Sequence, residues 1–169
     1  MASSMIHLAI THLLDETISF SDPARLYLGC VLADAGVSGN THLKKEIAEN
    51  TYTYDLLYYR KRFERNMECD DLYKGYYLHL IQDMIFRKFL YEEHHFSSLI
   101  PGNVEALHHD YSILNPFIIQ KYHLNSAMVQ NISLEKEPIK ELGNFDTVSF
   151  LKDLKAQFEP VTESSLSVF

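Results

Sequence analysis

The sequence of 169 residues predicts an all-α fold, a single-domain helical bundle. Apolar residues recur at intervals of three and four through most of the chain, as they do on the buried faces of helices. No stretch shows the convincing period-two alternation that is typical of a half-buried strand. The length suits one domain, so we expect one all-helical domain over residues 1–160 and a frayed tail over 161–169.

The composition is that of a folded, acidic domain. Hydrophobic residues make up 46% and aromatic residues 12%, which is enough for a sizeable core. The formal net charge of −8 argues against unspecific binding to nucleic acid. One basic run, Arg60-Lys61-Arg62, is followed by Glu64 and is best interpreted as the solvated face of a helix.

The two cysteines and the N-terminus predict a cytoplasmic location. Cys30 and Cys69 are isolated, so they form neither a disulfide framework nor a zinc ribbon, and Cys30 is expected to pack in the core. The N-terminal residues lack the basic and apolar regions of a signal peptide. No window of about 20 residues is uniformly apolar, so we expect no integral membrane association.

The first half of the chain predicts two helices joined by a turn. Residues 4–18 form the first helix, and we expect its buried side to carry Ile6, Ile10, Leu13 and Leu14. The run Ser21-Asp22-Pro23 is a helix start signal. Gly29 in the helix that follows costs about 1 kcal/mol relative to alanine, which indicates close packing of another backbone there. This helix ends in the turn-forming residues 34–40.

Further helices are expected along the rest of the chain. The predicted ranges are 52–65, 72 to about 94, a short helix that Asn103 caps, 116–122 and 147–158. Residues 125–144 have weak periodicity and are expected to be mostly loop. The terminal helix is amphipathic through Val148, Leu151, Leu154 and Phe158.

The long helix at 72–94 carries the most informative pattern in the chain. Its expected core-facing stripe has the spacing 4-3-4-3-4 and consists of Leu72, Tyr76, His79, Asp83, Phe86 and Leu90. His79 and Asp83 therefore lie one turn apart in an otherwise apolar stripe. Burying either group unpaired costs several kcal/mol, and a shared metal ion would remove that cost. The stripe thus predicts a metal site in the core, although a metal-free hydrogen bond between the two residues remains the alternative.

Three other residues could reach the same site. His7 lies on the first helix, Asp34 ends the second helix, and His42 follows a short loop. Imidazole and carboxylate ligands suit zinc best, and they also suit iron, nickel or manganese. His12 lies close to His7 on the same helix, and we prefer His7 as the ligand. His94, His95 and His123 are expected to be solvated.

Four short motifs, in order, resemble those of the zinc-dependent phospholipase C family, especially its short bacterial relatives. They are MIHL at 5–8, LGCVLAD at 28–34, THL at 41–43 and GYYLHLIQD at 75–83. The resemblance implies a phospholipase C/P1 nuclease-like fold with metal ligands at His7, Asp34, His42, His79 and Asp83. It also implies a hydrolase in which a metal-activated water attacks a phosphoester. Asp34 or Asp83 could ligate the metal and steer this water, and we take Asp34 as the catalytic residue.

The sequence also departs from the family pattern. The later histidines and glutamate that complete a trinuclear zinc site have no match here, so we expect one metal ion or two. The family's lipid substrate is not carried over, and a small soluble phosphoester is expected instead. Because the chain is acidic, the metal and a few cations must offset repulsion of such a substrate; Lys74 and Arg87 flank the long helix.

Two other functions remain open. The missing later ligands fit a non-catalytic domain that binds a metal or a partner. The run His108-His109-Asp110 is similar to the His–Asp doublet of HD-type phosphohydrolases, but Asn115-Pro116 is expected to interrupt the helix soon after it. The sequence assigns no definite role to His12, His108, His109 or Asp110, and it does not identify the oligomeric state.

Overall fold

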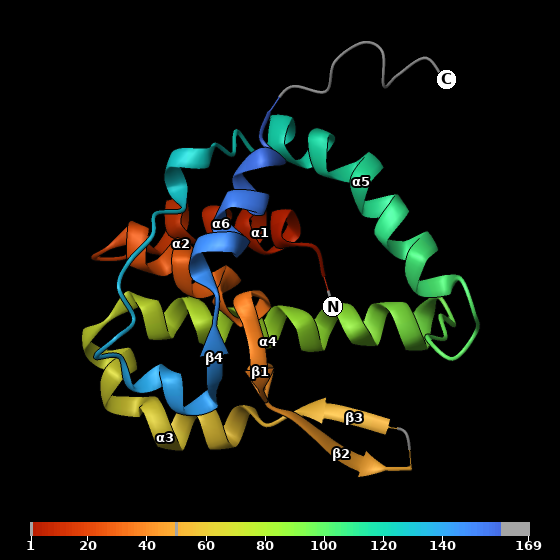
Figure 1. Ribbon diagram of the computed structural model, residues 1–169, viewed down its shortest axis with the longest axis horizontal. Coiled ribbons are helices and arrows are strands. Elements are labelled where there is room, and N and C mark those ends of the chain that lie inside the picture. The colour runs from red at the N-terminus through yellow and green to blue at the C-terminus, as the bar shows by residue number, and fades with distance from the viewer. Residues whose placement is uncertain (1, 50, 160–169) are drawn as a thin grey trace.

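The computed structural model describes residues 2–49 and 51–159 of the chain (Figure 1). The predicted helical fold is confirmed in its main feature, because six α-helices make up most of this part. They are α1 (Ser4–Ile18), α2 (Pro23–Leu32), α3 (Leu56–Cys69), α4 (Asp71–Lys88), α5 (Asn103–Lys121) and α6 (Thr147–Ala156). The predicted frayed tail, 161–169, lies outside the described residues.

Four short strands correct the expectation that the chain has none. β1 (Gly36–Gly39) pairs antiparallel with β4 (Gly143–Phe145), and β2 (Lys44–Ala48) pairs antiparallel with β3 (Thr51–Tyr54). Each strand has only three to five residues, mostly exposed, so no alternation of buried and exposed positions can mark them. The β1–β4 pair fixes the segment before α6 against the end of α2.

The centre of the fold is the contact between α2 and α4. Gly29 of α2 lies against the backbone of Leu72, and Gly75 of α4 lies against the backbone of Leu26. A Cβ atom at either glycine would overlap the carbonyl oxygen of the opposite helix. The predicted close approach at Gly29 is therefore confirmed, and a second glycine provides the other half of it. This contact brings the end of α2 alongside the middle of α4.

The buried face of helix α1 differs from the face that the sequence predicted. Its buried residues are Met5, His7, Leu8, Ala9 and Thr11. Ile10 and Leu13, which the sequence placed inside, are 39% and 45% exposed. Apolar residues occur on both sides of this helix, so periodicity alone could not select the face. The observed face is the one that carries His7, and it directs this side chain towards α2 and α4.

The second half of the chain differs from expectation at two places. Pro116 lies inside α5, so Asn115-Pro116 does not interrupt this helix as predicted. The buried Asn115 accepts a hydrogen bond from the Ser3 hydroxyl and donates one to Gln157, and these bonds hold the helix where Pro116 removes a backbone donor. In α6, Leu151 and Leu154 are buried as expected, but Val148 is 68% exposed.

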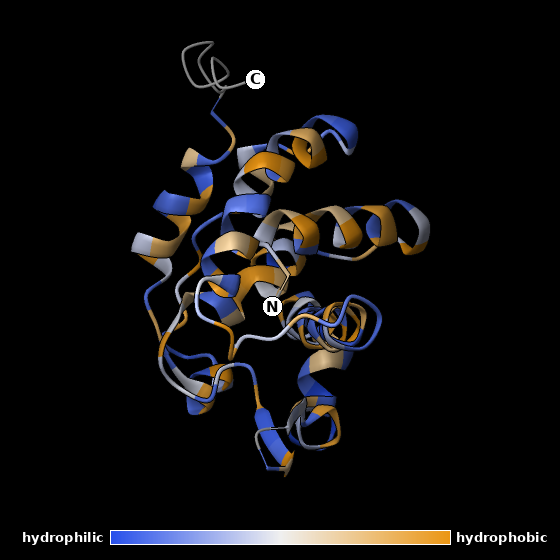
Figure 2. Cartoon of the chain, turned by 90° about the vertical axis from the view of Figure 1, so that its right-hand side faces the viewer, coloured by the Kyte–Doolittle hydropathy of each residue, from blue (hydrophilic) through white to orange (hydrophobic). Residues whose placement is uncertain are grey.

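Two helix starts differ from expectation: residues 52–54 lie in β3, so that α3 begins only at Leu56, and Gly102 rather than Asn103 is the N-cap of α5. The other ranges hold with small shifts. Residues 125–144 are mostly loop, interrupted by the 3-10 helices Ser126–Met128 and Pro138–Leu142 and by the start of β4. Helix α4 passes into a short π-helix, Phe89–Glu93, close to the predicted end at 94. Hydrophobic and hydrophilic residues alternate along the helices in Figure 2, as expected for amphipathic helices around a common core.

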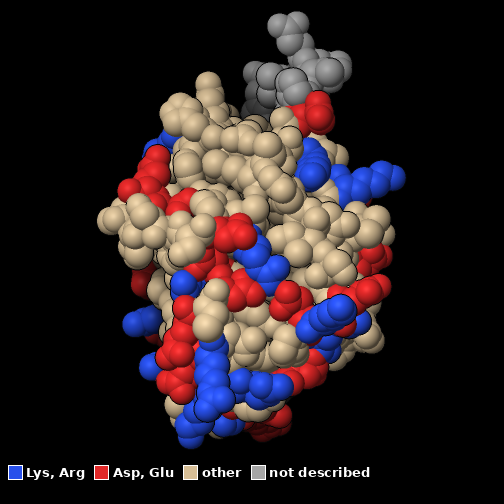
Figure 3. All heavy atoms as spheres, turned by 90° about the vertical axis from the view of Figure 1, so that its left-hand side faces the viewer, with Lys and Arg blue, Asp and Glu red and all other residues tan. Residues whose placement is uncertain are grey.

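The surface agrees with the interpretation of the basic run. On the face shown in Figure 3, basic side chains gather near the lower end and acidic side chains border them. Arg62 pairs with Glu141, and Arg25 pairs with Asp70 and Glu137. Within the described residues, no helix combines the length and apolar character that crossing a bilayer requires.

Candidate metal centre

Helix α4 supplies two residues of the candidate site. Asp70 caps the helix by accepting a hydrogen bond from the backbone N–H of Leu72 at 2.9 Å. His79 and Asp83 are completely buried, and their Nε2 and Oδ2 atoms are 3.5 Å apart. The predicted stripe is buried from Leu72 to Asp83 and becomes half-buried at Phe86. The helix thus carries an imidazole and a carboxylate into the dry interior.

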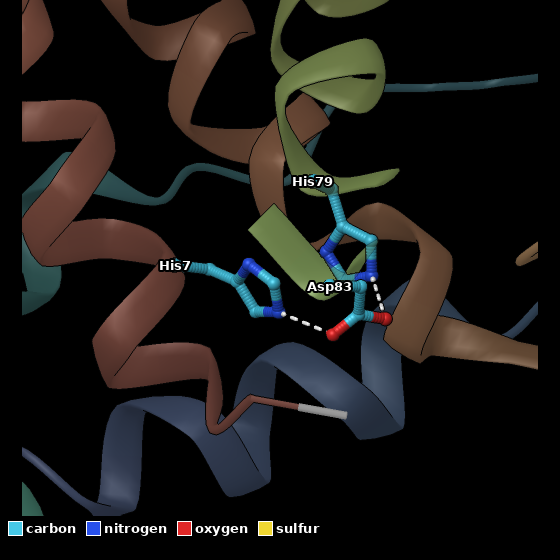
Figure 4. Close-up of side chains that lie close together, drawn as sticks. All are labelled: His7, His79 and Asp83. Carbon is cyan, nitrogen blue, oxygen red and sulfur yellow. Dashed lines mark ion pairs between the residues drawn. The ribbon is translucent and has the colours of Figure 1, made fainter. Parts of the chain in front are cut away.

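Helix α1 brings His7 to the same point (Figure 4). Ser3 caps this helix through its side chain, which accepts from the Ile6 N–H. The His7 ring is buried and stacks on the His79 ring with centroids 4.0 Å apart. Its Nε2 atom lies 3.4 Å from Oδ1 of Asp83. Two imidazoles from different helices therefore flank one carboxylate.

The end of α2 and the following turn supply the other two residues. Asp34 lies in the 3-10 turn Ala33–Ala35, and the Thr41 hydroxyl holds the next turn by donating to the Ala33 carbonyl at 3.0 Å. His42 Nε2 lies 3.3 Å from Asp34 Oδ1 and 3.7 Å from Asp83 Oδ2. Both side chains keep a small exposed fraction, 12% for His42 and 14% for Asp34. They form the rim of the cluster, whereas His7, His79 and Asp83 form its floor.

The structure therefore brings together all five residues that the sequence singled out. They form two groups of three potential ligands, and His79 belongs to both. The first group is His7, His79 and Asp83, and the second is Asp34, His42 and His79. Among the described residues these are the groups whose donor atoms lie close enough to hold one ion. The other histidines stay outside: His12 contacts the Tyr27 hydroxyl, while His108 and His109 are exposed on α5. His94, His95 and His123 are exposed, as expected.

Hydrogen bonds fix the tautomers of the two buried imidazoles. His79 Nδ1 must donate to the Cys30 carbonyl, 2.9 Å away, because a carbonyl only accepts. His7 Nδ1 donates to Oε1 of Gln82 at 2.6 Å, since the Gln82 amide group donates to Thr11. In the neutral form of both rings the proton is therefore on Nδ1, which leaves Nε2 with a lone pair. Such second partners orient metal-binding histidines in proteins.

Three buried polar atoms of the cluster consequently lack a hydrogen-bond partner. They are Nε2 of His7, Nε2 of His79 and Oδ2 of Asp83. With both rings neutral all three atoms are acceptors, so they cannot hydrogen-bond to one another. Leaving a buried polar atom unpaired costs about 1–3 kcal/mol, and a cation between these atoms would remove that cost.

The charges of the cluster also favour a cation. Burial lowers the pKa of His7, and the neighbouring His79 lowers it further. Burial alone would raise the pKa values of Asp34 and Asp83, but the adjacent imidazoles hold both below their ordinary range. Burial opposes protonation of His79, but Asp34 and Asp83 outweigh it and raise the pKa of His79 above its ordinary value. Two carboxylates thus remain ionised in a confined space, and a divalent cation would balance them.

The separations suit a small transition-metal ion. For metal–ligand distances of about 2.1 Å, a tetrahedral arrangement places ligand atoms about 3.4 Å apart. The five nitrogen–oxygen separations in the cluster range from 3.3 to 3.9 Å. Mixed imidazole and carboxylate donors are typical ligands of zinc, and also of iron, nickel and manganese. The residues present therefore fit the metal that the sequence implied.

Several contacts of the site were not found from the sequence. The backbone N–H of Ala2 donates to Asp83 Oδ1 at 2.9 Å, and the Ser4 hydroxyl donates to Asp34 Oδ2 at 3.1 Å. Gln82 could have been found, because it follows His79 by three residues on the buried side of the same helix. The Cys30 carbonyl could not, since a backbone acceptor has no side-chain signature.

A cleft of about 1520 Å³ opens beside the cluster. Ala2, Ser4 and Asp34 line its inner end. Its walls come from the β2–β3 hairpin, from the second half of α4 and from α5. Asp34 is therefore both a member of the cluster and part of the cleft surface, so a molecule in the cleft could contact the cluster at this residue.

Comparison with known proteins adds no relative: no family model, no curated protein and no solved structure matches this chain.

Proposed function

We propose that the protein is a metal-dependent hydrolase of small phosphoesters, with zinc or another divalent transition metal in the five-residue cluster. The observation that carries the proposal is the set of unpaired acceptors on His7, His79 and Asp83, buried beside a cleft. The four motifs that resemble the zinc-dependent phospholipase C family contain all five residues. A phospholipase C/P1 nuclease-like fold is part of the same proposal.

The five residues would have different roles according to their burial and their position at the cleft. His7, His79 and Asp83 are buried and rigidly oriented, so they would hold the metal and exclude water from its inner side. When bound, the metal would polarise a phosphoryl oxygen and lower the pKa of water towards 7. Asp34 faces the cleft, and its lowered pKa keeps it ionised, so its carboxylate can accept a hydrogen bond from a water molecule and orient it. The Ser4 hydroxyl holds this carboxylate in place.

A second candidate function is metal binding without catalysis. Five protein donors converge on the cluster, and structural zinc sites are closed by four protein ligands, whereas catalytic sites keep one position open. If all five residues bound one ion, no position would remain for a substrate or water. The cleft at Asp34 favours the catalytic proposal.

Hydrolysis assays on the zinc-loaded protein separate these functions. We expect turnover of p-nitrophenyl phosphate or bis-p-nitrophenyl phosphate, loss of turnover with a chelator, and a decrease of at least about 100-fold in Asp34→Asn. Asp110→Asn on the exposed face of α5 is the control and should retain full activity. Full zinc content without turnover of either ester would favour the non-catalytic function. Equal activity of Asp34→Asn and the wild type would exclude the role of Asp34.

A further inference from the structure

Arg87 lies one helical turn beyond the metal cluster. His79, Asp83 and Arg87 follow one another at intervals of four residues on α4, so they share one side of the helix. Four residues advance a helix by about 6 Å. Arg87 also lines the cleft, as do Lys44 and Lys88. The cleft is therefore lined by an arginine of α4 that lies on the same side of the helix as His79 and Asp83.

The Arg87 guanidinium is positioned but not neutralised. It lies 4.4 Å from the centroid of the Tyr91 ring, one turn further along, in a cation–π contact. Within residues 2–49 and 51–159, no carboxylate forms an ion pair with it, although Arg25, Arg62 and Lys74 all have acidic partners. Stacking on a ring face leaves the N–H groups in the guanidinium plane available to a ligand.

Tyr54, the last residue of β3, lines the same cleft as Arg87. Its side chain is buried but lines the cleft, and the described residues give its hydroxyl no hydrogen-bond partner. Burial raises the pKa of Tyr54, Asp83 raises it further, and Arg87 lowers it. The phenol therefore stays protonated, and its hydroxyl can act as a hydrogen-bond donor in the cleft.

We propose that Arg87 and Tyr54 bind the phosphate group of the substrate in this cleft, and thereby position it at the metal cluster. The inference rests on the proposed hydrolase function and adds the residues that recognise the substrate. The planar guanidinium matches two phosphate oxygens at once, and the Tyr54 hydroxyl adds a third donor. A chain of net charge −8 needs such a local cation to admit an anion.

Titration calorimetry with inorganic phosphate tests the inference on zinc-loaded protein, with the zinc content measured on the same samples. We expect Arg87→Gln to retain its zinc and to bind phosphate at least about tenfold more weakly, because it loses charged hydrogen bonds. Arg87→Lys should fall between Arg87→Gln and the wild type. Tyr54→Phe should weaken binding about threefold to tenfold. Arg60→Gln removes the same charge from the exposed surface of α3 and should bind as the wild type does.

The outcomes distinguish this inference from the proposed function. Equal phosphate affinity of Arg87→Gln and the wild type, both with full zinc, would overturn the inference and leave the metal site intact. Wild-type protein that holds zinc but binds no phosphate would have the same meaning. Wild-type protein that takes up no zinc would contradict the proposed function, and the inference would fail with it.

Discussion

The two halves of the molecule differ in what they bury. Helix α4, packed between α1, α2 and α3, buries nine of its 18 residues, including His79 and Asp83. Helix α5 has a similar length, but of its 19 residues only Asn115 is buried. In Figure 1, α5 runs diagonally from the region of α6 down to the far end of α4. We call α1, α2 and α4 the packed half, and α5 with the β2–β3 hairpin the open half.

The difference indicates that two regions have separate roles: the packed half holds the potential metal ligands, and the open half gives a substrate access to them. Ligands must be held rigidly and kept dry, which the packed half achieves by close backbone contact. A substrate must enter and leave, and the cleft between α4, α5 and the hairpin provides the room. Segments with few buried contacts open most easily, so the open half is expected to be the less stable one. Four predictions test this division, in order of decreasing effect.

The largest effect is expected at the α2–α4 contact. Gly75→Ala would place a Cβ atom on the Leu26 carbonyl oxygen and force the two helices apart. We expect the free energy of unfolding to fall by about 3 kcal/mol, measured by urea denaturation. Gly102→Ala, at the start of α5, is the control: no atom lies within 4 Å of its Cβ position, and only its φ of +88° opposes alanine, at a cost of about 1 kcal/mol. Equal costs at both glycines would contradict the division.

Zinc should raise the free energy of unfolding and slow local opening in the packed half, but not local opening of α5. At a free zinc concentration 100 times the dissociation constant, the free energy of unfolding should rise by about 2.7 kcal/mol. Hydrogen exchange measured by mass spectrometry should slow in α1, α2 and α4, which carry the cluster or support it, and remain unchanged in α5. Protection of α5 by zinc to the same extent would show that the two halves open as one unit.

Asp71 links the starts of α2 and α4 and should give a pH-dependent effect. Its carboxylate accepts from the Asp22 N–H and from Lys74, both at 2.6 Å. Burial alone would raise its pKa, but these partners lower it. We expect Asp71→Asn to cost about 2 kcal/mol at pH 7, measured by urea denaturation.

The pH dependence of that cost has a definite sign. Because the folded-state pKa of Asp71 lies below the unfolded value of about 3.9, its stabilisation is present above that pH and is lost as the pH falls through the folded-state value. The difference between Asp71→Asn and the wild type should therefore shrink below about pH 4. The exposed Asp153 on α6 provides the control variant Asp153→Asn. A constant difference from pH 7 to pH 2 would contradict the role of the Asp71 charge.

The smallest effect is expected where the open half is anchored. Asn115→Ala would remove the hydrogen bonds from α5 to Ser3 and Gln157. We expect a loss of about 1 kcal/mol in global stability, with faster hydrogen exchange in α5 but not in α4. Ser112→Ala, which loses one exposed bond to the His109 carbonyl, should leave exchange unchanged. Unaltered exchange in Asn115→Ala would show that α5 is held by other contacts.

The sequence predicted the packed half better than the open half, for a physical reason. A buried helix must keep its apolar stripe, so His79 and Asp83 could be recognised as polar residues within it. Helix α5 has no such constraint, and Pro116 therefore suggested a break that the structure does not have. The strands were missed because pairing of β1 with β4 depends on contacts between residues more than 100 positions apart.

The sequence predicted the potential metal ligands of the candidate site, but not the groups that hydrogen-bond to these ligands and orient them. Ordered motifs placed His7, Asp34 and His42 beside the stripe, and the structure brings these residues together. The prediction that Ile10 and Leu13 lie on the buried face of α1 was wrong. The face that is buried instead carries His7 into the core. The tautomers depend on the Cys30 carbonyl and on Gln82, and the carbonyl is available only because α2 and α4 pack so closely.

The most direct test of the central claim is the metal content of the purified protein. After loading with zinc and dialysis, elemental analysis should find at least one ion per chain in the wild type and in the control variant His108→Ala. His79→Ala should retain less than about a tenth of that zinc, because His79 belongs to both ligand groups. Folded wild-type protein that takes up no zinc or manganese, or His79→Ala with full zinc content, would contradict the claim that the buried cluster holds a metal ion.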